Sequence, residues 1–362
     1  MTPLAHLNKA TVQAFDRIDL LADPAALSRI LGPVAKVERE PPPVDPTGYS
    51  SSSHEILIAV LQNGTRLRLR LKRTHIGDDW LARLMRAAPP GREVLLLGEA
   101  SLLPVWSFFA RAHVAYAVEG SEVGLLMEDH SDRLLPDVRE PIPRATEEAL
   151  LRGIASLHAR FWEAPQLSLP WLARPEWYAD ILGPSQAGDD EALQGAPQSI
   201  RDGVARGWRE ALQLLPPEVV AKLTLPADQV WKSWSDLPKT LIHGDTKVAN
   251  FAFLADGRVA AFDWTNLGAA PSTLDLGWYL AVNSTRLTRS KDELIARYRE
   301  LLEQRLGRGL EPELWDRLLD AGIFSGARKL LWSKAVGLRE GTEFRRDDWA
   351  WWVERLTGWC AR

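Results

Sequence analysis

The sequence predicts an α+β protein of two parts, a strand-rich part followed by a helix-rich part. Short runs of Ile, Leu and Val with turn signals between them fill the first 130 residues. From Pro143 onward, apolar residues recur at helical spacing. One short strand-rich stretch, residues 240–262, interrupts the helical part. We therefore expect residues 1–130 and 131–362 to form two lobes with a cleft between them.

The composition is that of a globular protein. Of its 362 residues, 46% are hydrophobic and 25% charged, which is enough to bury a core without staples. A net charge of −4 argues against a protein that coats nucleic acid, because such proteins are strongly basic. The single cysteine, Cys360, excludes an internal disulfide and a cysteine-rich metal site. The sequence shows no signal peptide and no membrane-spanning run, so we expect a cytoplasmic protein without a membrane partner.

The first part begins with a predicted helical lead-in over residues 11–31, which Gly32-Pro33 ends. A proline-rich stretch then keeps the backbone extended. Gly48 and the serines from Ser50 to Ser53 predict a flexible polar turn before the next strand.

A β-hairpin follows this turn. Residues 54–61 are rich in Ile, Leu and Val, Asn63-Gly64 is a strong hairpin signal, and residues 65–72 alternate between leucine and basic side chains. The rest of the first part is predicted as two helices and two further strands: 78–87, 93–103, 112–118 and 124–127.

The second part is predicted to be mainly helical. Its candidate helices are 146–161, 198–215, 290–306, 311–339 and 344–358. Its strands are expected at 240–242, 251–254 and 259–262, with Asp256-Gly257 as a tight turn.

The segment LIHGDTKVANFAFLADGRVAAFDW carries the chemistry. Asp245, Asn250 and Asp263 each follow or flank a short apolar strand, which places polar groups at strand ends. Phosphoryl transfer from ATP needs a carboxylate to orient the attacking hydroxyl and oxygen ligands to hold Mg²⁺ against the phosphates. Each of these residues alone is equally a turn former or a strand end. The whole string at this spacing favours the catalytic interpretation.

HGDTKVAN followed by AFDW resembles the catalytic and metal-binding segments of the aminoglycoside phosphotransferase/choline kinase-like family, relatives of the protein kinases. Two further segments, ASLHARFW at 155–162 and PSTLDLGWYL at 271–280, are similar to family segments. The resemblance implies a protein-kinase-like fold, with a small antiparallel-sheet N-terminal lobe and a large, mainly helical C-terminal lobe. It implies Asp245 as the catalytic base, and Asn250 and Asp263 as magnesium ligands.

The resemblance also implies a nucleotide site. Lys72 resembles the lysine that contacts the α- and β-phosphates, and Glu93 resembles its helix partner, with Glu99 as a competing candidate. The other expected contacts are a loop over the phosphates and the interlobe hinge: Ser50, Ser51 and Ser52, then Glu128 and His130. Arg70 departs from the family, which usually has a small or apolar residue there. Lys72 could alternatively be a solvated lysine at a strand end, and the serines could belong to an ordinary hairpin loop.

Several other residues are interpreted as structural. His243 resembles the histidine that packs under the catalytic loop, and Asp275 resembles the aspartate that ties the next helix to that loop. His158 lies at helical spacing with apolar residues, so we expect a core histidine. The tryptophans of the last predicted helix cannot all face one way, so at least one is a candidate for an acceptor pocket: Trp349, Trp351 and Trp352.

Together these features predict an ATP- and Mg²⁺-dependent kinase, monomeric or homodimeric, that phosphorylates a small hydroxylated molecule such as a sugar, amino alcohol, aminoglycoside or natural product. A catalytically silent nucleotide-binding or scaffold protein on the same fold is the alternative. A protein substrate is disfavoured, because an activation loop of usual length is missing between Asp263 and Asp275. The basic residues of one predicted helix favour a neutral or weakly charged acceptor over a polycation: Arg328, Lys329 and Lys334.

Overall fold

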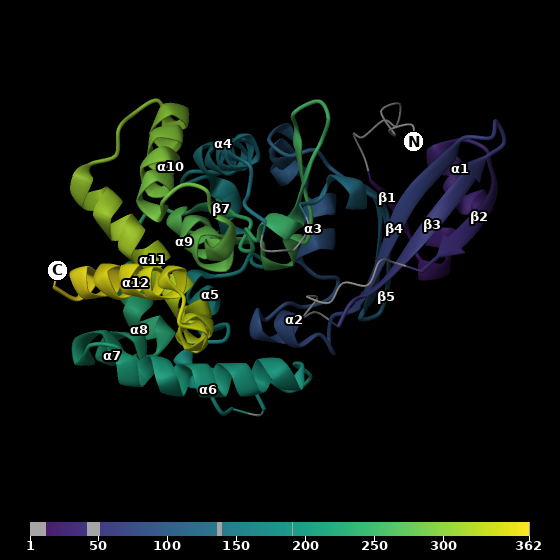
Figure 1. The fold of residues 1–362 in the computed structure, drawn as a ribbon. Coiled ribbons are helices and arrows are strands. Elements are labelled where there is room, and N and C mark those ends of the chain that lie inside the picture. Colours follow the sequence, from purple (N-terminus) through teal and green to yellow (C-terminus); the bar gives the residue numbers. More distant parts are fainter. Residues whose placement is uncertain (1–11, 42–50, 136–139, 190, 362) are drawn as a thin grey trace. The chain divides into compact units, whose positions relative to one another are not determined.

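The computed structural model describes residues 12–41, 51–135, 140–189 and 191–361 (Figure 1). The described residues form two compact units. The first is drawn from Met1–Arg83, Ala87–Leu134 and Ala252–Thr265, and the second from Leu84–Arg86, Leu135–Phe251 and Asn266–Arg362. Within these described ranges, no helix combines the length and the apolar character that crossing a membrane requires.

The first unit is built on a six-stranded sheet in the order β1-β5-β6-β4-β3-β2. Its strands are β1 Gln13–Phe15, β2 Val34–Glu40, β3 Ser53–Leu61, β4 Arg66–His75, β5 His113–Glu119 and β6 Glu122–Glu128. The sheet is mixed, because β1 pairs parallel with β5 while the other neighbours are antiparallel. The expected α+β class is confirmed, but the expectation of a purely antiparallel sheet is wrong at this edge.

The β3–β4 hairpin follows the sequence prediction. Leu57 pairs with Leu69, and the Asn63 side chain accepts a hydrogen bond from the Thr65 N–H in the turn. Gly64 has φ 82°, the left-handed conformation that this turn requires and that glycine adopts without strain. The alternation places leucines in the core on one face of β4 and basic residues, ending in Lys72, on the other.

The predicted helical lead-in is only partly correct. Residues 13–15 form β1, a 3₁₀ helix follows at Ile18–Ala22 (η1), and the α-helix α1 spans only Pro24–Leu31. Asp23 caps α1, because its side chain accepts a hydrogen bond from the Ala26 N–H at 2.7 Å. Pairing with β5 therefore overrides the local helical pattern at the start of the chain.

Two short helices and a second hairpin complete the first unit. The helices are α2 Trp80–Leu84 and α3 Arg92–Gly98, followed by η2 Ala100–Ser107. The single helix expected at 93–103 breaks at Glu99, whose side chain accepts from the Ser101 N–H. Strands β8 Phe251–Phe253 and β9 Val259–Ala261 form the expected hairpin, and Ala110 joins it to this unit by donating to the Val259 carbonyl at 2.7 Å.

The second unit is mainly helical, as predicted. Its α-helices are α4 Arg144–Arg160, α5 Pro175–Asp180, α6 Gln198–Leu214, α7 Pro217–Leu223, α8 Ala227–Lys232, α9 Thr273–Val282, α10 Lys291–Leu306, α11 Pro312–Gly337 and α12 Glu343–Ala361. Strand β7 Thr240–Ile242 pairs antiparallel with β10 Gly268–Ala270. The short 3₁₀ helices of this unit are Pro165–Ser168, Pro184–Gln186, Val248–Asn250, Ser284–Arg286 and Leu338–Glu340, whereas Ser131–Arg133 and most of Trp264–Asn266 belong to the first unit.

Helices α9 and α11 approach each other at glycines. A Cβ added to Gly277 would lie 2.0 Å from the Gly322 carbonyl oxygen, and one added to Gly322 would lie 2.2 Å from the Thr273 carbonyl oxygen. Only residues without a side chain allow backbones to pack this closely. This contact brings α9 and α11 together beside the loop that follows β7.

Candidate functional site

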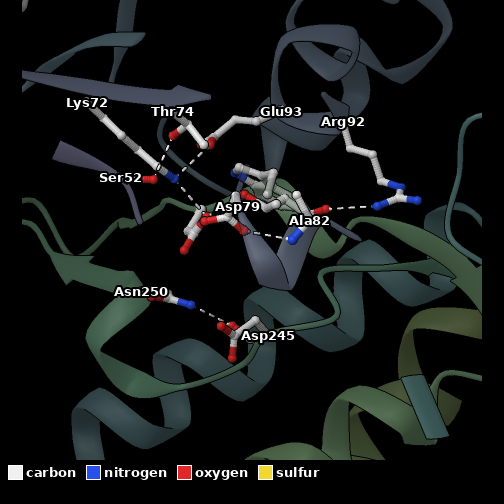
Figure 2. Close-up of polar contacts among 12 residues, drawn as sticks. Ser52, Lys72, Thr74, Asp79, Ala82, Arg92, Glu93, Asp245 and Asn250 are labelled. Atoms are coloured by element: carbon white, nitrogen blue, oxygen red, sulfur yellow. Dashed lines mark hydrogen bonds and ion pairs between the residues drawn. The ribbon is translucent and has the colours of Figure 1, made fainter. Parts of the chain in front are cut away.

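In the first unit, Lys72 lies between two carboxylates. Its Nζ is 2.9 Å from Asp263 Oδ1 and 3.5 Å from Glu93 Oε2 (Figure 2). Lys72 is 9% exposed and Glu93 5% exposed, so most of this charge cluster is withdrawn from water. His113 on β5 lies 3.0 Å from the other oxygen of Glu93. The structure thus brings together Lys72, Glu93 and Asp263 from three elements of one unit.

Mutual charge keeps these groups ionised. Burial alone would lower the pKa of Lys72, but the negative charges of Asp263 and Glu93 outweigh burial and raise that pKa above its ordinary value. Burial would likewise raise the pKa of Glu93, but the charge of Lys72 and the hydrogen bond with His113 hold it well below its usual range. The pKa of Asp263 is also lowered, against burial, chiefly by Lys72.

The structure separates the two glutamates that compete for Lys72. Glu93 on α3 reaches the ammonium, whereas Glu99 caps η2 by accepting hydrogen bonds from the N–H and hydroxyl of Ser101. Arg92, next to Glu93, donates to the carbonyl of Thr265 at 3.3 Å and so fixes α3 against the segment that carries Asp263.

Asp263 has an unusual backbone. Its φ is 56°, a left-handed value that is uncommon for residues other than glycine and that occurs more often in Asp and Asn than in most. Its side chain remains 40% exposed, and Oδ1 accepts a hydrogen bond from the Thr265 hydroxyl at 2.6 Å. A partly accessible carboxylate therefore follows the β8–β9 hairpin.

The expected phosphate loop is only partly described. Ser50 lies outside the described residues. The Ser51 N–H and hydroxyl both donate to one Asp79 oxygen, at 3.1 and 2.8 Å, and the Ser52 hydroxyl lies 2.6 Å from the Thr74 hydroxyl (Figure 2). Asp79 also caps α2 through the Ala82 N–H. These contacts tie Ser51 to the N-terminal end of α2 and Ser52 to β4.

The expected hinge residues lie at the end of β6. The Glu128 N–H donates to the Ala112 carbonyl at 2.9 Å, and His130 Nε2 lies 3.8 Å from a Glu128 oxygen. Arg70, the residue that departs from the family pattern, forms an ion pair with Asp129, the residue after Glu128. Its guanidinium lies 3.5 Å from the Asp129 carboxylate.

In the second unit, Asp275 anchors the loop after β7. One of its oxygens accepts the His243 N–H and the other accepts the Gly244 N–H, both at 2.8 Å. His158, fully buried as expected of a core residue, lies 3.1 Å from the same carboxylate. Burial alone would raise the pKa of Asp275, but its contacts with His158, His243 and Gly244 lower that pKa below its ordinary value.

This anchored loop presents Asp245 and Asn250. The Asn250 amide nitrogen donates to the Asp245 carbonyl at 3.0 Å (Figure 2). That bond assigns the Asn250 side-chain oxygen as the atom suited to a cation. The Asp245 N–H donates to His243 Nδ1 at 3.3 Å, so His243 supports the loop from within, as expected.

The contact between Trp278 and Asp245 was not predicted from the sequence. The indole Nε1 of Trp278 donates to Asp245 Oδ1 at 2.6 Å. From the sequence, a role at the site is expected only for a tryptophan of the last predicted helix. The available signal was helical spacing, because Trp278 follows the loop-anchoring Asp275 by three residues and shares its side of α9.

The three basic residues of α11 differ in role. Arg328 donates to the Ala179, Leu223 and Leu225 carbonyls, and Lys334 is bound to Asp348 at 2.8 Å, so neither supports the acceptor argument made from the sequence. Lys329 donates to the Gly244 carbonyl in the loop after β7 at 3.3 Å. Burial lowers its pKa to about 8, an effect that the charges of Asp245 and Asp275 oppose.

The expected metal ligands fit magnesium by type. Asp263 offers a partly exposed carboxylate in the first unit, and Asn250 offers an amide oxygen in the second. Within the described ranges, the structure has no cluster of three or more His, Cys, Asp or Glu side chains suited to a metal. Mg²⁺ suits such a sparse oxygen set, because it usually binds one or two protein oxygens together with water and phosphate oxygens.

The solved structures to which this chain is similar include small-molecule kinases. Choline kinase LicA from Streptococcus pneumoniae is 10% identical, with 92% of this chain and 97% of that chain covered and a TM-score of 0.45. An aminoglycoside phosphotransferase from Alicyclobacillus acidocaldarius is 17% identical, with 89% and 96% covered and a TM-score of 0.39. An amicoumacin kinase solved with AMP-PNP, Ca²⁺ and Ami is 14% identical, with 84% and 85% covered and a TM-score of 0.44.

No curated protein matches this sequence significantly. The model of the phosphotransferase enzyme family (APH), in contrast, matches residues 59–318, which include Lys72, Glu93, Asp245, Asn250 and Asp263. This chain belongs to the APH phosphotransferase family.

Proposed function

We propose that this protein is an ATP- and Mg²⁺-dependent kinase that transfers the γ-phosphoryl group to a hydroxyl of a small molecule. The observation that carries the proposal is the presentation of Asp245. Its side chain is partly exposed at the end of β7, on a loop that Asp275 holds through two backbone N–H groups. A carboxylate fixed in this way can orient an attacking hydroxyl and accept its proton.

In the proposed reaction, the acceptor hydroxyl oxygen forms a bond to the γ-phosphorus of ATP. The bond from that phosphorus to the oxygen bridging the β- and γ-phosphates breaks, ADP leaves, and the hydroxyl proton passes to Asp245. Lys72 contributes a positive charge for the α- and β-phosphates, and Glu93 keeps that ammonium in place. Asn250 and Asp263 would hold Mg²⁺, which when bound would neutralise charge on the phosphates.

The charges beside Asp245 support a neutral or weakly charged acceptor rather than a polycation. A polycation requires an excess of acidic side chains. Lys329 places a positive charge near Asp245, and the neighbouring carboxylate of Asp275 is fully engaged with N–H groups. Sugars and other uncharged natural-product alcohols are therefore the first acceptors to test.

The test measures Mg²⁺-dependent ADP release from ATP with a panel of sugars, amino alcohols, aminoglycosides and natural-product alcohols. Asp245→Asn should abolish transfer and leave ATP affinity largely intact, because other groups hold the nucleotide. Asp228→Asn, an exposed aspartate on α8, is the matched control. Turnover of the Asp245→Asn variant within tenfold of wild type contradicts the assignment of the base. ATP binding without turnover in wild type favours the catalytically silent alternative.

A further inference from the structure

Two side chains, the partly buried Trp278 of α9 and the buried Lys329 of α11, contact the Asp245 carboxylate and the backbone just before it, respectively. The indole Nε1 of Trp278 donates to Asp245 Oδ1 at 2.6 Å. The Lys329 ammonium lies 4.0 Å from the centroid of the Trp278 ring, within the range of a cation–π contact. The same ammonium donates to the Gly244 carbonyl at 3.3 Å, one residue before Asp245.

The burial of Lys329 has to be compensated by its contacts in this arrangement. The residue is 5% exposed, and taking an ammonium out of water is costly unless it is compensated. Its contacts are a carbonyl, the faces of two aromatic rings, Trp278 at 4.0 Å and Tyr178 at 6.0 Å, and the charges of Asp245 and Asp275. Lys334, five residues along the same helix, instead lies against the carboxylate of Asp348.

Resting on the function proposed above, we infer that Trp278 and Lys329 are positioning residues for the catalytic base. Trp278 holds Oδ1 of Asp245 and thereby assigns proton acceptance to Oδ2. Lys329 fixes the plane of the indole through its ring face and fixes the loop backbone through the Gly244 carbonyl. The carboxylate is then oriented before the acceptor binds, which removes an ordering cost from the transfer step.

The glycine contact between α9 and α11 supports this role. Gly326 on α11 is so close to α9 that an added Cβ would lie 2.6 Å from the Gly277 carbonyl oxygen. Gly277 directly precedes Trp278, and Gly326 is three residues before Lys329. The two helices are therefore in backbone contact where they carry the indole and the ammonium, so the pair has little freedom to separate.

Trp278 is tested with two replacements, one of which keeps the apolar ring and the other of which keeps an N–H donor. Phenylalanine keeps an apolar ring and removes the N–H. Histidine is smaller and more polar, but its Nε2, like the indole Nε1, lies two bonds from Cγ and carries a hydrogen at pH 8 in one neutral tautomer. If hydrogen-bond donation is what matters, Trp278→His retains more activity than Trp278→Phe. If ring packing is what matters, the order is reversed.

The experiment measures kcat and the KM for ATP in two reactions. One is ATP hydrolysis, in which water is the acceptor, and the other is phosphoryl transfer to the best acceptor of the panel. Trp278→Phe should lower kcat tenfold or more and leave the KM for ATP within twofold, because the nucleotide groups Lys72 and Glu93 belong to the other unit. Trp208→Phe is the control, since Trp208 is buried and donates an equivalent bond, 2.7 Å long, to the Leu182 carbonyl.

Lys329 is tested in the same way. Lys329→Met should lower kcat at least fivefold, and Lys329→Arg should retain more activity because a guanidinium also binds ring faces and carbonyls. Lys334→Met controls for the loss of a buried ammonium from α11, and kcat is calculated per folded molecule.

The outcomes separate this inference from the proposed function. Transfer that depends on Asp245 but is equal in Trp278→Phe and wild type, or lower in Trp278→His than in Trp278→Phe, overturns the inference alone. Absence of any Asp245-dependent turnover in wild type removes the proposed function and this inference with it.

Discussion

The ammonium of Lys72 lies closer to Asp263 than to Glu93, at 2.9 Å against 3.5 Å. Asp263 follows Lys72 by 191 residues, yet its hairpin belongs to the same compact unit. Glu93 is almost fully buried, whereas the Asp263 side chain is 40% exposed. Lys72 therefore has one buried carboxylate partner and one that remains accessible to solvent.

We expect Lys72→Met to lower ATP affinity or turnover at least tenfold. Charge-assisted hydrogen bonds of this kind contribute on the order of 1.5–3 kcal/mol, and about 1.4 kcal/mol corresponds to one decade. The variant should also be less stable by about 3 kcal/mol, because Glu93 then stays buried without its cation. Nucleotide titration and urea unfolding measure the two effects.

The control for Lys72 is Arg70→Met on the same face of β4. Arg70 is partly exposed and pairs with Asp129, so its loss should change stability by less than about 1 kcal/mol. The double variant Lys72→Met/Glu93→Gln should recover stability but not ATP affinity. If Arg70→Met is the damaging change and Lys72→Met is silent, the nucleotide site has been assigned two residues too late in the strand.

A second prediction concerns the metal. Asp263→Ala should remove the magnesium dependence of nucleotide binding, since alanine offers no oxygen ligand. Asp256→Ala is the matched control, because Asp256 lies in the turn of the same hairpin and its exposed carboxylate binds Arg258. Isothermal titration with ATP, with and without Mg²⁺, measures the effect. Equal magnesium dependence in Asp263→Ala and wild type excludes this ligand.

A third prediction concerns the loop anchor. Asp275→Asn replaces one acceptor oxygen by an N–H₂ group, so either the His243 or the Gly244 N–H loses its partner. Asp275 is 1% exposed, and an unsatisfied buried donor costs roughly 1–3 kcal/mol. We expect a stability loss of that size together with at least a tenfold fall in kcat.

Asp292→Asn is the comparison for the loop anchor, because Asp292 makes its ion pair with Arg355 at the surface. That change should cost less than about 1 kcal/mol and leave kcat unaltered. A stable Asp275→Asn protein with normal turnover shows that the loop does not depend on this carboxylate.

Local patterns predicted much of the fold. The alternation around Asn63-Gly64 defines one register, because shifting it would expose the leucines of β4, and the structure has that hairpin. Helices with long apolar periodicity, such as α10 and α11, begin and end within two residues of their predicted limits. The start of the chain was not predictable in this way, because β1 is a strand only through its pairing with β5.

In the candidate site, too, the residues marked by local sequence patterns were predicted and those brought in by tertiary packing were not. Asp245, Asn250 and Asp263 were found because short spacing and strand ends mark them within one segment. The partners of Asp245 were not found, because Trp278 is 33 residues away and Lys329 is on a different helix. A buried lysine without a carboxylate in direct contact has no sequence signal distinct from an exposed one. Its burial depends on the approach of α9 and α11, which only the structure shows.

The last prediction concerns pH and Lys329. Burial lowers the pKa of this ammonium from 10.5 to about 8 in the folded protein, while the unfolded chain retains the ordinary value. Between pH 8 and 10.5 the unfolded state therefore binds more protons, and stability rises with pH, by at most roughly 3 kcal/mol. Below pH 8 Lys329 is protonated in both states, so its contribution to stability does not change with pH.

The measurement is the free energy of unfolding of wild type minus that of Lys329→Met, determined in urea from pH 7 to 10. This difference isolates the contribution of Lys329, because the other titrating groups cancel. Lys36→Met removes an exposed lysine and serves as the control. A difference between wild type and Lys329→Met that stays constant up to pH 10 contradicts burial of a charged Lys329 beside Trp278.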